Sequence, residues 1–115
     1  MLLIQYWHSE EIPDYIADWS ASFRTHNPGL DHLIFDPATA ETFIAKHFSP
    51  REVAAFRALA IPSTQASYLR YCAVLTLGGI YSDADFRCVG SLKSFQGATG
   101  TPLLETCIGN CHGAN

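Results

Sequence analysis

Residues 78–85 read Gly78-Gly79-Ile80-Tyr81-Ser82-Asp83-Ala84-Asp85, and they directly follow an apolar segment, residues 67–77. The apolar segment has the residue spacing of a largely buried helix. The two glycines end that helix because they can adopt left-handed backbone angles, and the next three residues form a short apolar strand. A buried helix that leads into a short strand predicts an α/β fold with mainly parallel strands.

The segments upstream show the same alternation of strands and helices. Apolar runs predict strands at 2–7 and 31–36, and helical spacing predicts helices at 14–23, 37–48 and 50 to just before Pro62. Ser49 and Glu52 have the spacing of a capping box, and Ser63 or Thr64 is expected to cap the helix that ends at Leu77. Beyond Arg87 the pattern predicts a loop and one further strand near residues 102–108.

Length and composition limit the class of protein. The 115 residues allow one domain, residues 1–115, and the 48% of hydrophobic residues against 16% charged predict that it folds. Seven Lys and Arg against eleven Asp and Glu give a net charge of −4, which argues against nucleic acid as a partner. No apolar run approaches the roughly 20 residues of a transmembrane helix, and no signal peptide is recognisable. We therefore expect a cytoplasmic protein with no transmembrane segment, and peripheral membrane association stays open.

The cysteines are expected to be reduced thiols. Four of them lie at uneven spacings in a chain without an export signal: Cys72, Cys88, Cys107 and Cys111. Cys107, Cys111 and His112 could in principle be metal ligands, but their spacing matches no common zinc site.

Asp83 and Asp85 are the strongest candidates for chemistry. In an extended segment, residues two apart point to the same side, so both carboxylates are expected to converge at the carboxyl end of the strand. Two converging carboxylates favour a hard divalent cation such as Mg²⁺ or Mn²⁺, which can also bind diphosphate oxygens. In open α/β sheets the ligand crevice lies at this same edge. The five histidines are scattered, and we expect each to be a surface or hydrogen-bonded residue: His8, His26, His32, His47 and His112.

At these residues the sequence resembles the glycosyltransferases whose sugar-binding region carries an Asp-x-Asp motif, a family related to yeast initiating mannosyltransferases and clostridial glucosylating toxins. The resemblance covers nearly the whole chain. Its matching segments occur in the family's order: Ile4-Gln5-Tyr6-Trp7, Asn27-Pro28-Gly29, Phe35-Asp36, Ala66 to Tyr71, and Gly78 to Asp85.

The resemblance implies a Rossmann-like domain of the GT-A type that binds a nucleotide-sugar and Mn²⁺ or Mg²⁺. It implies an enzyme that transfers a hexose to a glycan or other acceptor with retention of configuration, and surface polysaccharide synthesis would be its setting. By the same resemblance, Asp85 ligates the metal, and Asp83 bonds the ribose or reaches the metal through water. Arg70 contacts the donor and Trp7 stacks on the nucleobase.

The chain departs from the family pattern in two ways. The family's helix has Ala-Asp where this chain has Ala66-Ser67, so an acidic residue expected to bind the donor is replaced by a hydroxyl. Family domains also run to about twice the length of this chain, by the usual size of nucleotide-binding α/β domains. We therefore expect a donor-binding half that is incomplete at the C-terminus and has little transferase activity alone.

Two other function classes stay open. Nucleotidyltransferases and phosphatases also hold metals with Asp-x-Asp. Nucleotidyltransferases, however, have a helix between their Gly-Ser pair and the carboxylates, and phosphatases favour Thr where this chain has Arg87. A non-catalytic nucleotide-sugar-binding or interaction module is the other alternative, favoured by Ser67 and by the short length.

Overall fold

The computed structural model describes residues 1–92 of the chain. The strand expected near residues 102–108 and the possible ligands Cys107, Cys111 and His112 lie outside the described residues. Within them, the elements follow one another in this order: β1 (Leu2–Tyr6), α1 (Asp14–His26), β2 (Asp31–Phe35), α2 (Pro37–His47), α3 (Pro50–Ala58), α4 (Pro62–Leu77) and β3 (Ile80–Tyr81). The predicted alternation of strands and helices is confirmed.

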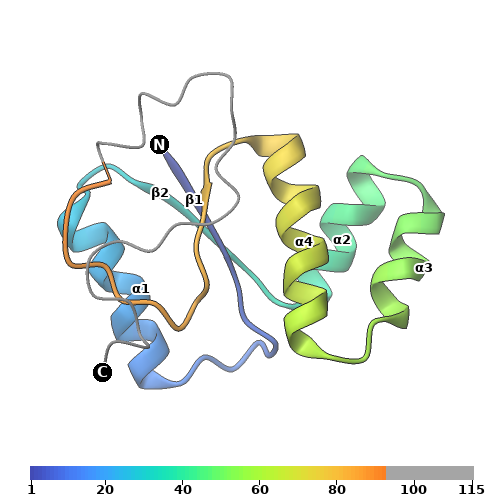
Figure 1. Ribbon diagram of the computed structural model, residues 1–115, viewed down its shortest axis with the longest axis horizontal. Helices are drawn as coiled ribbons and strands as arrows, with labels where there is room; N and C mark the ends of the chain where they lie inside the picture. Colours follow the sequence, from blue (N-terminus) through green and yellow to red (C-terminus); the bar gives the residue numbers. More distant parts are fainter. Residues whose placement is uncertain (93–115) are drawn as a thin grey trace.

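The three strands form a parallel sheet in the order β2-β1-β3. Leu3 pairs with Ile80 and Ile4 with Tyr81, so β3 adds to β1 after a long crossover connection. Helix α1 lies on one side of the sheet, and α4, α2 and α3 lie on the other (Figure 1). The mixed α/β class with a small parallel sheet is therefore confirmed.

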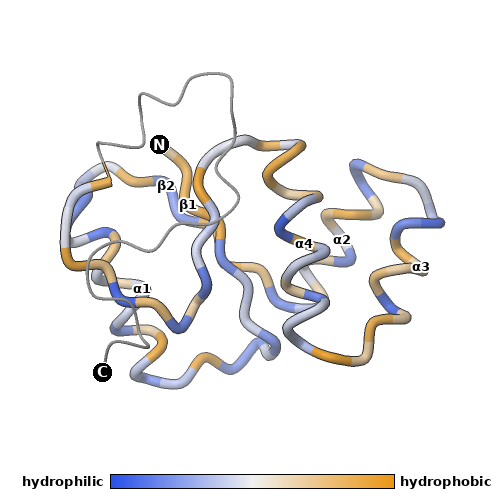
Figure 2. Tube along the Cα trace, viewed as in Figure 1, coloured by the Kyte–Doolittle hydropathy of each residue, from blue (hydrophilic) through white to orange (hydrophobic). Residues whose placement is uncertain are grey.

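Successive side chains of β1 enter two different cores. Ile4 and Tyr6 pack with buried residues of α2, α3 and α4, whereas Leu3 packs with Phe23 of α1 and with Ile80. This alternation is the period of two that a strand imposes when both faces of its sheet are covered. Figure 2 shows hydrophilic residues on the loops that follow β1 and β3, at the edge where these strands end.

The helix starts are set by local sequence. Asp36 and Thr39 form a capping box at α2, in which the Asp36 carboxylate accepts the Thr39 N–H at 2.8 Å. The predicted box at α3 is also present, and the Glu52 carboxylate accepts the Ser49 N–H at 2.9 Å. The cap predicted for α4 is wrong, because Pro62 begins the helix and Thr64 lies in its first turn. There the Thr64 hydroxyl donates to the Ile61 carbonyl instead of accepting an N–H.

Helix α4 is less buried than its sequence predicts. Leu69, Cys72, Ala73 and Val74 are buried, but Leu75 is 75% exposed on the same helix. The apolar residues surround most of the helix, so their spacing does not identify which side meets the sheet. The prediction of a largely buried helix holds for one face only.

The glycines between α4 and β3 have the backbone angles that the sequence predicts. Gly78 has φ 70° and Gly79 has φ 85°. A Cβ atom on Gly79 would lie 2.6 Å from the Leu2 carbonyl oxygen, so the backbone also passes too close to β1 for any side chain. Gly79 thus allows β3 to pair with β1.

Among residues 1–92, no helix is both long and apolar enough to cross a membrane.

Candidate functional site

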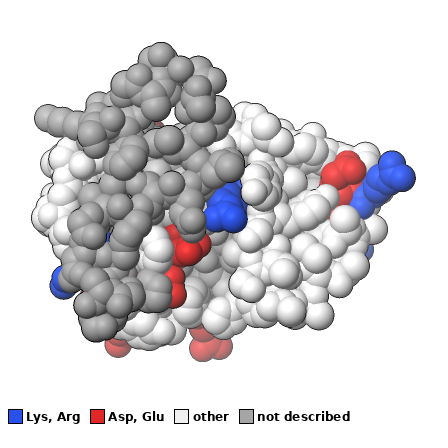
Figure 3. Space-filling view, in the orientation of Figure 1, with Lys and Arg blue, Asp and Glu red and all other residues white. Residues whose placement is uncertain are grey.

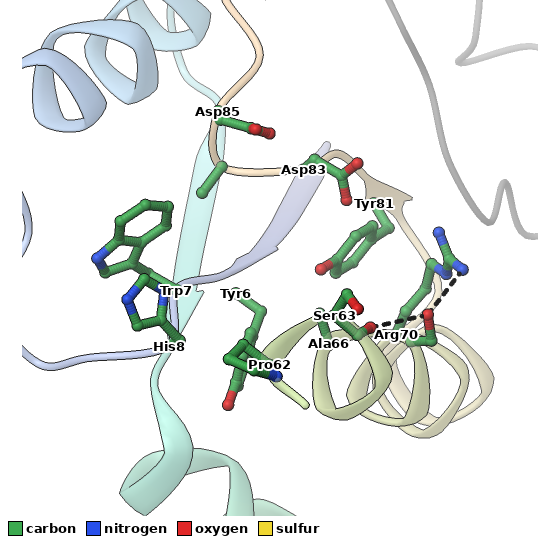
Figure 4. A pocket seen from close by; sticks show the side chains of 12 residues that line it. Tyr6, Trp7, His8, Pro62, Ser63, Ala66, Arg70, Tyr81, Asp83 and Asp85 are labelled. Carbon is green, nitrogen blue, oxygen red and sulfur yellow. Dashed lines mark hydrogen bonds between the residues drawn. The ribbon is translucent and has the colours of Figure 1, made fainter. Parts of the chain in front are cut away.

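A pocket of about 440 Å³ lies at the carboxyl-terminal edge of the sheet. Its walls come from the end of β1, from the first half of α4 and from the loop after β3. The five residues that the sequence nominated all line it: Trp7, Ser67, Arg70, Asp83 and Asp85. Figure 4 shows the two aspartates at one rim, with the Trp7 and His8 rings on one side and Tyr81 and Arg70 on the other.

The aspartates lie on a turn and not on an extended strand. Strand β3 ends at Tyr81, and the Phe86 N–H donates to the Asp83 carbonyl at 3.2 Å, which closes a turn over residues 83–86. The extended geometry expected for the pair is therefore wrong. The alternation it predicted is nevertheless present in the burial: Ser82 and Ala84 are buried, while Asp83 and Asp85 are half-buried and line the same pocket.

The donor set of the pocket suits a hard divalent cation. Two carboxylates separated by one residue, open to a pocket of this size, can supply oxygen ligands and leave positions for water or phosphate oxygens. Within residues 1–92 there is no group of three or more His, Cys, Asp or Glu side chains that could hold a metal alone.

Helix α4 presents one side to the pocket. Its lining residues have the spacing of neighbours on one helix face: Pro62, Ser63, Ala66, Ser67 and Arg70. The Arg70 Nη2 donates to the Ser67 hydroxyl at 3.4 Å, and that hydroxyl donates to the Ser63 carbonyl at 3.1 Å. Ser67 therefore contacts the guanidinium that an aspartate at this position would pair with, but without the charge.

Aromatic rings position the Arg70 guanidinium. Its central carbon lies 5.5 Å from the centre of the Tyr81 ring and 5.6 Å from that of Tyr71. Each distance is within the range of a cation–π contact. Tyr81 is buried, and its side chain is also part of the pocket wall. In the space-filling view, basic and acidic side chains adjoin near the centre of the face that is shown (Figure 3).

The end of β1 supplies aromatic groups. The Trp7 and His8 rings lie 4.5 Å apart at their centres, tilted by 42°. Tyr6 donates its hydroxyl to the Gln65 side-chain carbonyl at 3.1 Å. Burial, with a smaller contribution from Asp36, raises the pKa of Tyr6 to about 12, so the phenol stays protonated and is a hydrogen-bond donor at neutral pH.

Sequence reasoning missed His8, Tyr6 and Ser63 as pocket residues. His8 was expected to be an ordinary surface histidine; it is exposed, and it also lines the pocket. The signal that identifies it is position, because β1 and β3 are parallel neighbours and the residues after both must meet at one edge. Ser63 would have followed from extending the helical spacing of Ala66, Ser67 and Arg70 by one turn.

Comparisons with known proteins agree on one class. Residues 3–102 match the family described as "Glycosyltransferase sugar-binding region containing DXD motif". The chain is 28% identical over 79 residues to the "Initiation-specific alpha-1,6-mannosyltransferase" of Schizosaccharomyces pombe, which covers 65% of this chain and 19% of the relative. It is 24% identical over 83 residues to the "Putative glycosyltransferase HOC1" of Saccharomyces cerevisiae, which covers 70% of this chain and 21% of that protein.

The chain thus spans about a fifth of the length of these curated relatives. No solved structure matches it significantly. The family match favours glycosyltransferases over the nucleotidyltransferases and phosphatases that also use paired aspartates.

Proposed function

The chain belongs to the family of glycosyltransferases with a sugar-binding region that contains a DXD motif, and on that premise we propose that its pocket binds a nucleotide-sugar donor together with Mn²⁺ or Mg²⁺. The observation that carries the proposal is the meeting of Asp83, Asp85, Arg70 and Trp7 in one pocket at the carboxyl edge of a parallel sheet. This is the edge at which open α/β sheets bind nucleotides. The described residues would be the nucleotide-binding part of a Rossmann-like, GT-A type domain.

Each pocket wall has a part in this proposal. Asp85 would hold the metal directly, and Asp83 would bond the ribose or hold the metal through water. The Trp7 ring, with His8 beside it, would stack on the nucleobase. Arg70 would donate to a diphosphate or sugar oxygen from the opposite wall, in a direction set by the Tyr81 ring.

The reaction we propose is transfer of a hexosyl group to a glycan or other acceptor, with retention of configuration. When bound, the metal supplies Lewis-acid stabilisation of the negative charge on the departing nucleoside diphosphate. The protein's own contribution is to hold the diphosphate between the acidic turn and Arg70, so that the bond to the sugar lies at a fixed place. The mannosyltransferase named among the relatives supports a hexose as the sugar.

The proposal predicts nucleotide binding that depends on the metal. We expect the 115-residue chain to bind UDP or GDP in the presence of Mn²⁺, measured by isothermal titration calorimetry. Omitting Mn²⁺, or replacing Asp85→Asn, should weaken that binding by about tenfold or more, because carboxylate charge holds the cation.

Asp31→Asn is the matched control for this experiment. It removes the same charge at the opposite end of the sheet, where Asp31 begins β2 and is exposed. Its binding should stay within about twofold of the wild type. Nucleotide affinity that is equal with and without Mn²⁺, or equal in Asp85→Asn, would contradict the proposal.

A second candidate, a non-catalytic nucleotide-sugar-binding module, is favoured by the Ser67 hydroxyl at the position of the family's acidic residue. The two candidates differ in turnover. Because the 115 residues are expected to have little transferase activity alone, the assay needs a longer chain that contains them. A catalytic protein should then release nucleoside diphosphate from UDP- or GDP-hexoses in the presence of Mn²⁺ as the hexose passes to an acceptor or to water, whereas the module should bind the nucleotide-sugars and release none.

A further inference from the structure

A chain of hydrogen bonds runs behind the pocket, on the α1 side of the sheet, and ends at the acidic turn. Gln5 lies at its centre: it belongs to β1 and is fully buried. Its side-chain amide nitrogen donates to the Asp83 carbonyl at 3.1 Å. Its side-chain oxygen accepts from the Ser20 hydroxyl at 3.2 Å and contacts His32 Nε2 at 2.6 Å.

The chemistry of the two ends fixes the direction of every hydrogen bond in this chain. The Asp83 backbone carbonyl can only accept, so the Gln5 amide must point its NH₂ group toward the turn and its oxygen toward Ser20 and His32. His32 must then carry its proton on Nε2. At the outer end Arg24 can only donate, and its Nη1 lies 2.5 Å from His32 Nδ1, which accepts.

The charge state of His32 is consistent with these directions. Burial, followed by the nearby Arg24 guanidinium, lowers the pKa of His32 to about 4. The imidazole is therefore neutral at physiological pH, with one donor and one acceptor nitrogen. The order Arg24, His32, Gln5 and Asp83 thus has one consistent set of donors and acceptors.

Gln5 differs from the other donors to the Asp83 carbonyl. The Ser82 hydroxyl and the Phe86 N–H also donate to it, at 3.3 and 3.2 Å, but both belong to the loop itself. Among the described residues, Gln5 is the donor that comes from the central strand, 78 positions away in the sequence. The loop's own hydrogen bonds give the turn its shape, whereas Gln5 fixes where the turn lies relative to the sheet.

We propose that Gln5 is a positioning residue for metal and nucleotide binding, held in one orientation by Ser20 and by the neutral His32, and that it fixes the Asp83–Asp85 turn at the pocket rim. The part of this inference that concerns metal and nucleotide binding rests on the proposed function. Its structural part, the fixed position of the turn, is independent of any ligand.

Two measurements on the full 115-residue chain test the two parts separately. Hydrogen exchange of the Phe86 amide, followed by NMR without ligand, reports on the turn. Calorimetry with UDP or GDP and Mn²⁺ reports on binding. In Gln5→Met, which keeps the length and loses the N–H donor, we expect Phe86 exchange about tenfold faster and the affinity about three- to tenfold weaker.

Three further variants separate positioning from general stability. Ile44→Val loosens the other core, on the side of the sheet away from Phe86 and the hydrogen-bond chain, and it should leave both readouts unchanged at a comparable loss of thermal stability. His32→Leu removes the donor to Gln5 at the partly exposed end of the chain and should reproduce a smaller form of both effects. His32→Gln, which can still donate an amide N–H, should restore the exchange rate and the affinity toward their wild-type values.

The outcomes distinguish the two claims. Equal exchange rates and affinities in Gln5→Met and Ile44→Val would overturn the positioning role, as would a failure of His32→Gln to differ from His32→Leu. If the wild-type chain binds no metal–nucleotide pair, the proposed function fails, and the exchange rates alone decide whether Gln5 holds the turn. If Gln5→Met does not fold, the two His32 variants carry the test.

Discussion

Arg70 is a permanent cation held between two tyrosine rings at the wall of an otherwise acidic pocket. Its hydroxyl partner Ser67 is uncharged, so this hydrogen bond does not neutralise the guanidinium. A family aspartate at position 67 would neutralise part of that charge. A serine at position 67 is therefore compatible with the proposed contact between Arg70 and a phosphate.

Replacing Arg70→Met should weaken the binding of UDP or GDP with Mn²⁺ by about tenfold, because one charge-assisted hydrogen bond to the diphosphate is lost. The affinity of Arg70→Lys should lie between those of the wild type and Arg70→Met, since an ammonium group keeps the charge but not the planar arrangement of donors. The control is Arg57→Met, which removes an exposed arginine of α3 paired with Glu41. Equal affinities for Arg70→Met and Arg57→Met in calorimetry would show that Arg70 does not contact the nucleotide.

At the scale of elements, the junction of α4 and β3 depends on one glycine. Gly79 combines φ 85° with a Cβ position 2.6 Å from the Leu2 carbonyl oxygen, whereas Gly29 has the same φ and open space around it. Gly79→Ala should lower the free energy of unfolding by about 2–4 kcal/mol, from the left-handed backbone and the steric overlap together. Gly29→Ala should cost about 1 kcal/mol, from the backbone alone. Urea denaturation followed by circular dichroism measures the free energy of unfolding of both variants. Equal decreases would show that β1 shifts to make room for the new methyl group.

The sequence predicted those elements whose signals are local. Apolar runs located the strands, and the Ser49 and Glu52 spacing located the start of α3, because a capping box involves only four residues. The exposed side of α4 was missed, since which face of an apolar helix meets the sheet depends on tertiary packing. The turn at residues 83–86 was missed for a similar reason: an Asp-x-Asp triplet has no strong turn signal, and its carbonyl is held by a glutamine from another strand.

The candidate site was predicted only in part. Motif residues on α4 and after β3 could be nominated because their residue types carry the chemistry. His8 and Tyr6 could be placed in the pocket only once β1 and β3 were known to be parallel neighbours. Gln5 lies in a segment that carries the family resemblance, but its contacts with His32 and Asp83 had no sequence signal, because these residues belong to different elements.

For the whole molecule, His32 links stability to pH. Its folded pKa is lowered from the ordinary value of 6.5 to about 4, so between these values the unfolded chain binds more protons than the folded one. The free energy of unfolding should therefore fall as the pH is lowered from about 6.5 toward 4, and be unaffected by this group above 6.5. Thermal denaturation at several pH values measures the effect. In His32→Gln, which does not titrate, the dependence in this interval should be shallower; an unchanged slope would exclude His32 as its source.

The parallel pairing of β1 with β3 also has a consequence for the order of folding. Gln5 and Asp83 are in contact although they lie 78 positions apart in the sequence. The two walls of the pocket therefore cannot come together until most of the described chain has been synthesised. During translation, α1, β2 and the helices after them can associate first, leaving one side of β1 without its second neighbour. The pocket would then be the last part of this region to assemble. A nascent chain released from the ribosome before Ile80 would display an open strand edge in its place.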